Sequence, residues 1–146
     1  MSVKRVSPEE AKALMENESY AYLDVRSIPE FEAGHPAGAY NIPIAHMTAG
    51  GMRPNAGFLA EVASVFPKDA KLVVGCKMGG RSLRAVQALI QTGYEHVVDQ
   101  RAGFDGARDP FGQLQEAGWH RVGFDVALEA QPGRSYDELI GSGKEG

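Results

Sequence analysis

Short apolar runs alternate along the chain with segments in which apolar residues recur every three or four positions. The runs predict β-strands at residues 3–6, 20–25, 39–43, 71–75 and 95–99. The periodic segments predict amphipathic helices over residues 58–66 and 82–92, and Ser7-Pro8 predicts a capped helix over residues 8–16. Strands that alternate with helices are typical of a parallel sheet between helical layers. The pattern therefore predicts an α/β fold.

The strand at residues 71–75 is the most apolar of the set. Its continuous run Leu72-Val73-Val74 suits the centre of a sheet that is covered on both faces. After residue 100 the chain is rich in Gly and Pro and weakly periodic, which predicts helix fragments and loops that wrap the domain. Within that region, residues 135–140 predict one capped turn of helix.

Composition narrows the classes of partner. The 146 residues are 43% hydrophobic and 23% charged, as in one compact domain. Fifteen Lys and Arg against nineteen Asp and Glu give a formal charge of −4, which offers no basic surface for nucleic acid. The sequence contains neither an apolar run of the roughly 20 residues that cross a bilayer nor the apolar core of a signal peptide. We therefore expect a cytoplasmic protein without a nucleic-acid or membrane partner.

Cys76 is the only cysteine of the chain. It can form neither an intramolecular disulfide nor a cysteine-rich metal site, and we expect neither a metal nor another cofactor. A lone free cysteine is more often buried and structural than functional. The residues around Cys76, two glycines and two cations, favour a functional thiol instead.

The position of Cys76 gives a chemical reason for that preference. The residue follows the strand at 71–75 and precedes the helix at 82–92, so it lies where free backbone N–H groups and the helix dipole point to one spot. A thiol placed there is expected to favour the nucleophilic thiolate. Gly79 and Gly80 lack a Cβ, which lets the backbone curl around an anion with its N–H groups inward.

The other side chains of the loop suit the same chemistry. Lys77 and Arg81 place positive charge beside the thiol. The planar guanidinium of Arg81 can bond several carbonyl or carboxylate oxygens at once and so tie the loop together. Met78 either forms an apolar wall at the mouth of the loop or simply packs against the protein, and the residue type leaves both open.

Two blocks of sequence resemble a known family. The motif Cys76-x-x-Gly79-x-Arg81-Ser82 after an apolar strand closely resembles the active-site loop of the rhodanese family of sulfurtransferases. The block from Leu23-Asp24-Val25-Arg26 to Asn41-Ile42-Pro43 is similar to the family's other signature, in the expected order and separation. Residues 51–59 are similar to single-domain rhodaneses of the plant senescence-associated type and their bacterial relatives. The resemblance covers residues 3–103.

This resemblance implies a three-layer α/β/α fold with a five-stranded parallel sheet. It also implies sulfur transfer from thiosulfate, or a similar donor, to cyanide or a thiol, including a protein thiol, through a persulfide on Cys76. Asp24 and Arg26 are implied to brace the loop through hydrogen bonds. The persulfide would be held by the residues that follow the cysteine, Lys77, Met78, Gly79, Gly80, Arg81 and Ser82.

Two other functions are weighed against sulfur transfer. Cysteine-dependent phosphatases resemble Cys-x5-Arg, whereas four residues separate Cys76 from Arg81, so a phosphatase or arsenate reductase is disfavoured. A non-catalytic binding module, or an oxidant sensor acting through Cys76, is the main alternative. Domains of the non-catalytic class often lack the cysteine, and its presence favours the enzyme.

The chain departs from the family after its last predicted strand. The family usually has Gly-Gly-x-x-x-Trp, whereas this chain has Arg101-Ala102-Gly103-Phe104-Asp105-Gly106-Ala107, and Trp119 comes later. The packing of the C-terminal part and substrate access are therefore open. We predict one domain over residues 1–128 with an insertion at about 108–122, followed by a tail over 129–146 with one short helix.

Overall fold

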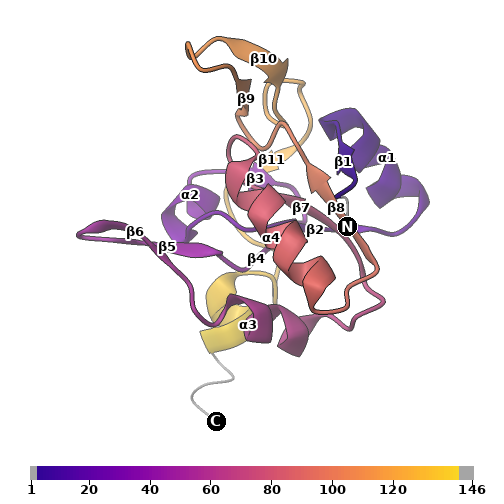
Figure 1. The fold of residues 1–146 in the computed structure, drawn as a ribbon, viewed down its shortest axis with the longest axis vertical. Coiled ribbons are helices and arrows are strands. Elements are labelled where there is room, and N and C mark those ends of the chain that lie inside the picture. The colour runs from indigo at the N-terminus through magenta and orange to yellow at the C-terminus, as the bar shows by residue number, and fades with distance from the viewer. Residues whose placement is uncertain (1–2, 142–146) are drawn as a thin grey trace.

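The computed structural model describes residues 3–141. Its centre is a five-stranded sheet in the order β1-β8-β7-β2-β4 (Figure 1). The strands are β1 (Arg5–Val6), β2 (Ala21–Asp24), β4 (Tyr40–Asn41), β7 (Lys71–Gly75) and β8 (His96–Gln100). All neighbouring strands are parallel. The apolar strand β7 is central, as predicted, because both of its faces are covered.

Four helices follow from local signals in the sequence. They are α1 (Pro8–Asn17), α2 (Ile28–Glu32), α3 (Phe58–Val65) and α4 (Gly80–Gln91). Helix α1 begins with a capping box in which Ser7 Oγ accepts from Glu10 N and the Glu10 carboxylate accepts from Ser7 N. The short helix α2, which the hydrophobic pattern did not predict, begins with Ser27 and Pro29 in a similar arrangement.

Side chains on the two faces of the sheet form two buried clusters. Leu23, Leu72 and Val74 pack against α3 and α4 on one face. On the other face Tyr22 packs beside α1 and contacts Trp119 edge to face, with ring centroids 5.4 Å apart. The predicted α/β/α layers around a five-stranded parallel sheet are thus confirmed. Trp119 is buried, so the C-terminal part of the chain belongs to the core.

The sequence predicts only helix fragments and loops after residue 100, and this prediction is wrong because three short antiparallel strands lie in that region. Strands β9 (Gly106–Arg108) and β10 (Leu114–Ala117) form a hairpin, and β11 (Val126–Ala127) pairs with β3 (His35–Pro36). A second unpredicted hairpin joins β5 (Ala45–Thr48) to β6 (Gly51–Pro54). Strands of two to four residues are too short to give a readable alternation. The predicted turn of helix near residue 135 occurs as a π-helical turn, η1 (Asp137–Gly141).

Most of the β9–β10 hairpin lies within residues 108–122, where the sequence predicts an insertion. The hairpin extends from the body of the molecule near one end of the view (Figure 1). Among the described residues, no helix is both long enough and apolar enough to cross a membrane. The domain limits, and the tail as far as residue 146, stay predictions; residues 142–146 lie outside the described part of the chain.

Candidate functional site

The cysteine loop, residues 76–79, connects β7 to α4 at the carboxyl edge of the sheet. Cys76 follows Gly75, the last residue of β7, and Gly79 precedes α4 with φ +101°. Position 75 requires glycine for a steric reason, because a Cβ there would overlap the Tyr22 hydroxyl. The edge of a parallel sheet at which a strand leads into a helix N-terminus is a favourable place for an anion.

The sulfur of Cys76 is buried and hydrogen-bonded. Only 2% of the residue is exposed. Gly79 N donates to Sγ at 3.1 Å, and the thiol donates to Ser82 Oγ at 3.4 Å. A backbone N–H group of the loop therefore faces the sulfur, as the two-glycine pattern predicts.

The segment after β8, residues 101–105, donates backbone hydrogen bonds to the cysteine loop and is called the supporting segment below. Phe104 N donates to the carbonyl of Cys76 at 2.7 Å, and Asp105 N donates to the carbonyl of Lys77 at 3.0 Å. Gly103, with φ +68°, allows this close approach, because a Cβ there would overlap the carbonyl of Lys77. These contacts provide hydrogen-bond donors for two loop carbonyls.

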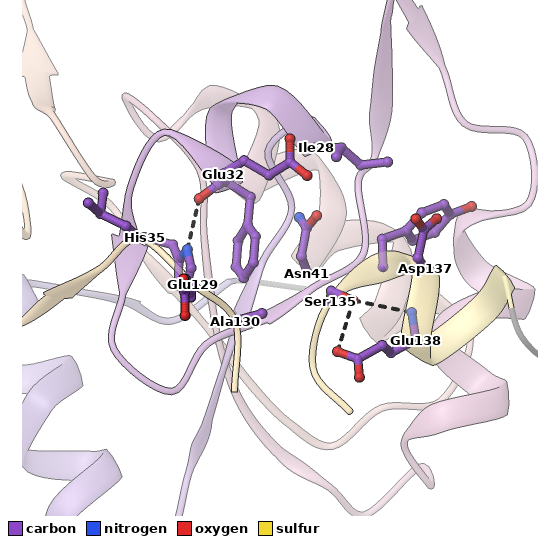
Figure 2. Close-up of a pocket in the computed structure, with 12 residues that line it drawn as sticks. Ile28, Glu32, His35, Asn41, Glu129, Ala130, Ser135, Asp137 and Glu138 are labelled. Atoms are coloured by element: carbon purple, nitrogen blue, oxygen red, sulfur yellow. Dashed lines mark hydrogen bonds between the residues drawn. The ribbon is translucent and has the colours of Figure 1, made fainter. Parts of the chain in front are cut away.

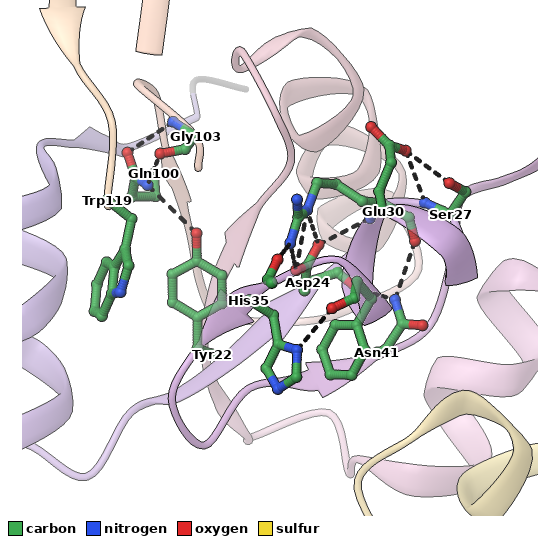
Figure 3. A network of polar contacts seen from close by, with 12 residues as sticks. Tyr22, Asp24, Ser27, Glu30, His35, Asn41, Gln100, Gly103 and Trp119 are labelled. Atoms are coloured by element: carbon green, nitrogen blue, oxygen red, sulfur yellow. Dashed lines mark hydrogen bonds and ion pairs between the residues drawn. The ribbon is translucent and has the colours of Figure 1, made fainter. Parts of the chain in front are cut away.

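Gln100, the last residue of β8, organises this supporting segment (Figure 3). Its side-chain oxygen accepts from Ala102 N and Gly103 N, both at 2.9 Å. Its side-chain nitrogen donates to Gly103 O at 2.8 Å and to the Tyr22 hydroxyl at 3.3 Å. Gln100 is fully buried, and the sequence pattern did not single it out.

Arg81 binds a carboxylate on another helix. Its two terminal nitrogens donate to Glu30 Oε1 and Oε2 at 2.7 and 2.9 Å, the bidentate geometry that Arg favours. This hydrogen bonding raises the pKa of Arg81. Burial alone would raise the pKa of Glu30, but hydrogen bonds from Arg81 and Ser27 outweigh it and lower the pKa to about 2. Arg81 thus ties α4 to α2, and Glu30 is a partner that the sequence analysis missed.

Asp24 and Arg26 form a buried ion pair. Arg26 donates to Asp24 Oδ2 at 2.8 Å and to Gly34 O at 2.7 Å. The guanidinium also lies 4.4 Å from the ring centroid of Phe104. The direct hydrogen bonds to the loop that the resemblance implies are absent within residues 3–141. The pair instead contacts Phe104, whose backbone holds the carbonyl of Cys76.

Ser82 and Asp99 continue the polar contacts of the sulfur into the protein. Ser82 Oγ donates to Asp99 Oδ1, and Arg5 Nε donates to Asp99 Oδ2 at 2.7 Å. Burial raises the pKa of Asp99, although its hydrogen bonds with Ser82 and Arg5 act in the opposite direction. A lone acidic residue at the end of an apolar strand, β8, is the sequence signal that could have identified Asp99.

The remaining loop residues differ in exposure. Lys77 is exposed, and Met78 is 51% exposed, so Met78 is not a core residue. Gly80 begins α4, and a Cβ built there would meet no atom within 4 Å. The structure therefore brings together the backbone of the predicted loop, Ser82 and Arg81, while Lys77 and Met78 lie at the surface.

A separate cavity of about 350 Å³ lies between α2 and the C-terminal segment (Figure 2). Its walls include Phe31, Asn41 and Tyr136, and four acidic residues, Glu32, Glu129, Asp137 and Glu138. His35 also lines the cavity, and its Nδ1 bonds to Phe31 O at 2.8 Å. None of residues 76–82 lines this cavity.

This fold and this loop define a rhodanese-like protein. Residues 7–109 match the family described as "Rhodanese-like domain", and the chain belongs to that family. Thiosulfate sulfurtransferase 16, chloroplastic, of Arabidopsis thaliana is 41% identical over 85 residues, which are 58% of this chain and 71% of the relative.

Two further comparisons agree with the family. Senescence-associated protein DIN1 of Raphanus sativus is 39% identical over 100 residues, 68% of this chain but only 52% of the relative. The chain thus spans about half the length of that relative. The crystal structure of Rv0390 from M. tuberculosis superposes with a TM-score of 0.72 at 24% identity, covering 88% of this chain and 100% of that one. At this identity the superposition supports the fold alone.

Proposed function

We propose that this chain is a sulfurtransferase that carries sulfane sulfur as a persulfide on Cys76. Thiosulfate is the proposed donor, and cyanide or a thiol is the acceptor. The observation that carries the proposal is the hydrogen bond from Gly79 N to Cys76 Sγ at 3.1 Å, at the N-terminus of α4. A backbone donor preorganised toward sulfur favours the thiolate and the terminal persulfide anion over their protonated forms.

The reaction has two displacement steps. The Cys76 thiolate attacks the sulfane sulfur of thiosulfate, the S–S bond of the donor breaks, and sulfite leaves with the bonding electron pair. The acceptor then attacks the outer sulfur of the persulfide, and the Cys76 thiolate is regenerated. Both steps are nucleophilic substitutions at sulfur, and together they return the protein to its starting state.

The side chains of the loop have separate proposed roles. Arg81, held by Glu30, fixes the first turn of α4 against α2. It thereby preserves the shape of the cradle, the backbone of residues 76–79 around the Cys76 sulfur. Lys77 is exposed at the loop, where its charge favours the approach of an anionic donor. Asp24 and Arg26 support the cradle through Phe104.

Loop length favours sulfur over phosphate. Four residues separate Cys76 from Arg81, one fewer than in the Cys-x5-Arg loop that surrounds a tetrahedral phosphate. Among the relatives, the names of two Arabidopsis proteins include thiosulfate sulfurtransferase, whereas others are named only for the domain. A cytoplasmic location remains a prediction.

Intact-mass measurement tests the proposal directly. Incubation with thiosulfate should add one sulfur atom to the wild-type chain and none to Cys76→Ala, and cyanide should remove that sulfur as thiocyanate. A panel that also includes mercaptopyruvate would identify the donor. An unmodified wild-type thiol with every donor would refute the proposal. A stable protein partner would then favour the binding module, and reversible sulfenic acid at Cys76 would favour the sensor.

A further inference from the structure

Cys76, Ser82 and Asp99 form a continuous hydrogen-bonded chain that ends in a buried carboxylate. The thiol donates to Ser82 Oγ at 3.4 Å, and Ser82 Oγ donates to Asp99 Oδ1. The Ser82 and Asp99 residues are each 0% exposed, and Cys76 is 2% exposed. The three side chains come from the loop, α4 and β8, so the fold brings them together although they are separate in sequence.

The single hydroxyl proton of Ser82 determines what this chain can do. Asp99 Oδ1 is the nearer acceptor, at 2.5 Å against 3.3 Å for Gly79 O. While Ser82 donates to Asp99, its oxygen can only accept from Cys76, which favours the thiol. Ser82 can donate to a thiolate only when Asp99 is protonated and donates to Ser82 in turn. The protonation states of the sulfur and the carboxyl are therefore coupled.

We propose that Asp99 is a positioning residue that receives the Cys76 thiol proton through Ser82. The S–H bond breaks and its proton moves to Ser82 Oγ, while the original hydroxyl proton of Ser82 moves to Asp99 Oδ1. The electron pair stays on Sγ, and no oxidant, reductant or other reactant takes part. The inference rests on the proposed function only in that the resulting thiolate is the nucleophile for sulfur transfer.

The surroundings of Asp99 are suited to holding this proton. Its second oxygen accepts from Arg5 on β1 at 2.7 Å, and the positive charge of Arg101 also acts on it from the segment after β8. Ser82 faces it from α4, and Cys76 lies beyond Ser82. The two cations favour the carboxylate, while complete burial favours the neutral acid. These opposed effects allow the proton to move between Asp99 and the sulfur.

The alkylation rate of Cys76 by iodoacetamide, measured against pH, tests the relay. Because Cys76 is the only cysteine, the reaction reports one thiol without any need for sulfur transfer. Asp99→Asn keeps the shape and can still donate to Ser82, but it cannot accept the proton and carries no charge. The alkylation midpoint should therefore move down by about one pH unit. Asp69→Asn, an exposed residue in the turn before β7, controls for the change in net charge.

A double-variant cycle separates the relay from simpler effects. In a Ser82→Ala background, the shift caused by Asp99→Asn should shrink to less than half, because the connecting hydroxyl is gone. An equal shift in both backgrounds would mean that the Asp99 charge acts through space, and it would overturn the relay. No shift in either background would leave Asp99 a purely structural partner of Arg5, which also overturns it.

A measurement on the unsubstituted chain covers the case in which Asp99→Asn does not fold. The Asp99 carboxyl carbon is titrated by NMR before and after Cys76 is capped as a methyl disulfide. Capping removes the S–H donor, whose hydrogen bond to Ser82 strengthens the bond that Ser82 donates to the Asp99 carboxylate. The Asp99 transition should therefore move to higher pH, and an unchanged or lower transition would contradict the relay. If the wild-type chain takes no sulfur from any donor, the proposed function fails, while these titrations still decide the relay.

Discussion

The ion pair between Arg81 and Glu30 gives the sharpest prediction for the cysteine loop. Glu30→Gln keeps the size of the side chain but replaces the bidentate ion pair, at 2.7 and 2.9 Å, with a single neutral acceptor. Helix α4 then loses the ion pair that joins it to α2. We expect lower stability and slower formation of the Cys76 persulfide, because Arg81 lies in the first turn of the helix that carries the cradle.

The size of the effect follows from the environment of the pair. The side chains of Arg81 and Glu30 are 18% and 22% exposed, which places the pair between surface and buried ion pairs. The fall in the pKa of Glu30 from its ordinary 4.5 to about 2 corresponds to on the order of 3 kcal/mol in favour of the ionised form. Because Gln retains one hydrogen bond, the expected loss of unfolding free energy at neutral pH is about 2 kcal/mol.

The dependence on pH has a definite sign. Glu30 has a depressed pKa in the folded state, so its stabilisation is complete above the ordinary value of 4.5 and is lost as the pH falls toward about 2. Urea unfolding of wild type and Glu30→Gln should therefore differ most near neutral pH. The difference should narrow to on the order of 1 kcal/mol at about pH 3, where Glu30 is mostly protonated in the unfolded state but still mostly ionised in the native state.

Glu32→Gln provides the matched control, because Glu32 is an exposed residue of the same helix. It should leave the unfolding curve nearly unchanged. Persulfide formation by Glu30→Gln, followed by mass after mixing with thiosulfate, should slow about tenfold, the effect of about 1.4 kcal/mol on a barrier. Equal stability of wild type and Glu30→Gln at every pH would refute the role assigned to the pair.

Substitutions at Arg81, Gly75 and Gly80 test the loop and its neighbouring strand and helix. Arg81→Lys should slow persulfide formation, because an ammonium cannot hold both Glu30 oxygens in the fork geometry, and Arg81→Ala should nearly abolish it; a fully active Arg81→Ala would show that its role is misassigned. Gly75→Ala should lower the free energy of unfolding in urea by about 1–3 kcal/mol, because its Cβ overlaps the Tyr22 hydroxyl. Gly80→Ala has open space at its Cβ and should preserve or raise the melting temperature.

The central sheet and the cysteine loop could be predicted because their signals are local. The run Leu72-Val73-Val74 predicts a central strand by itself, and the glycines beside Cys76 predict the curled backbone. Glu30 and Asp99 could not be paired with their partners in the same way. Each meets its partner through the packing of separate elements, α2 on α4 and β8 beside β7, which no local pattern records.

The supporting segment after β8 shows the same limit in another form. The sequence has a glycine at position 103, but only the three-dimensional contact shows why. Its φ is positive, and its missing side chain makes room for the carbonyl of Lys77. The direct bracing expected of Asp24 and Arg26 differed for a related reason, since their contact with the loop passes through Phe104.

Gly103→Ala and Gly112→Ala separate backbone strain from contact with the loop. Both glycines have positive φ, +68° and +82°, so alanine costs about 1–2 kcal/mol of strain at either. At Gly112, in the β9–β10 hairpin, the added Cβ meets nothing within 4 Å, whereas at Gly103 it overlaps the carbonyl of Lys77. Gly103→Ala should therefore lose about 1–3 kcal/mol more in unfolding and should also slow persulfide formation, because the displaced carbonyl distorts the cradle around Cys76. Gly112→Ala should form the persulfide at the wild-type rate. Equal rates for the two variants would mean that the segment after β8 stabilises the fold without shaping the cysteine loop.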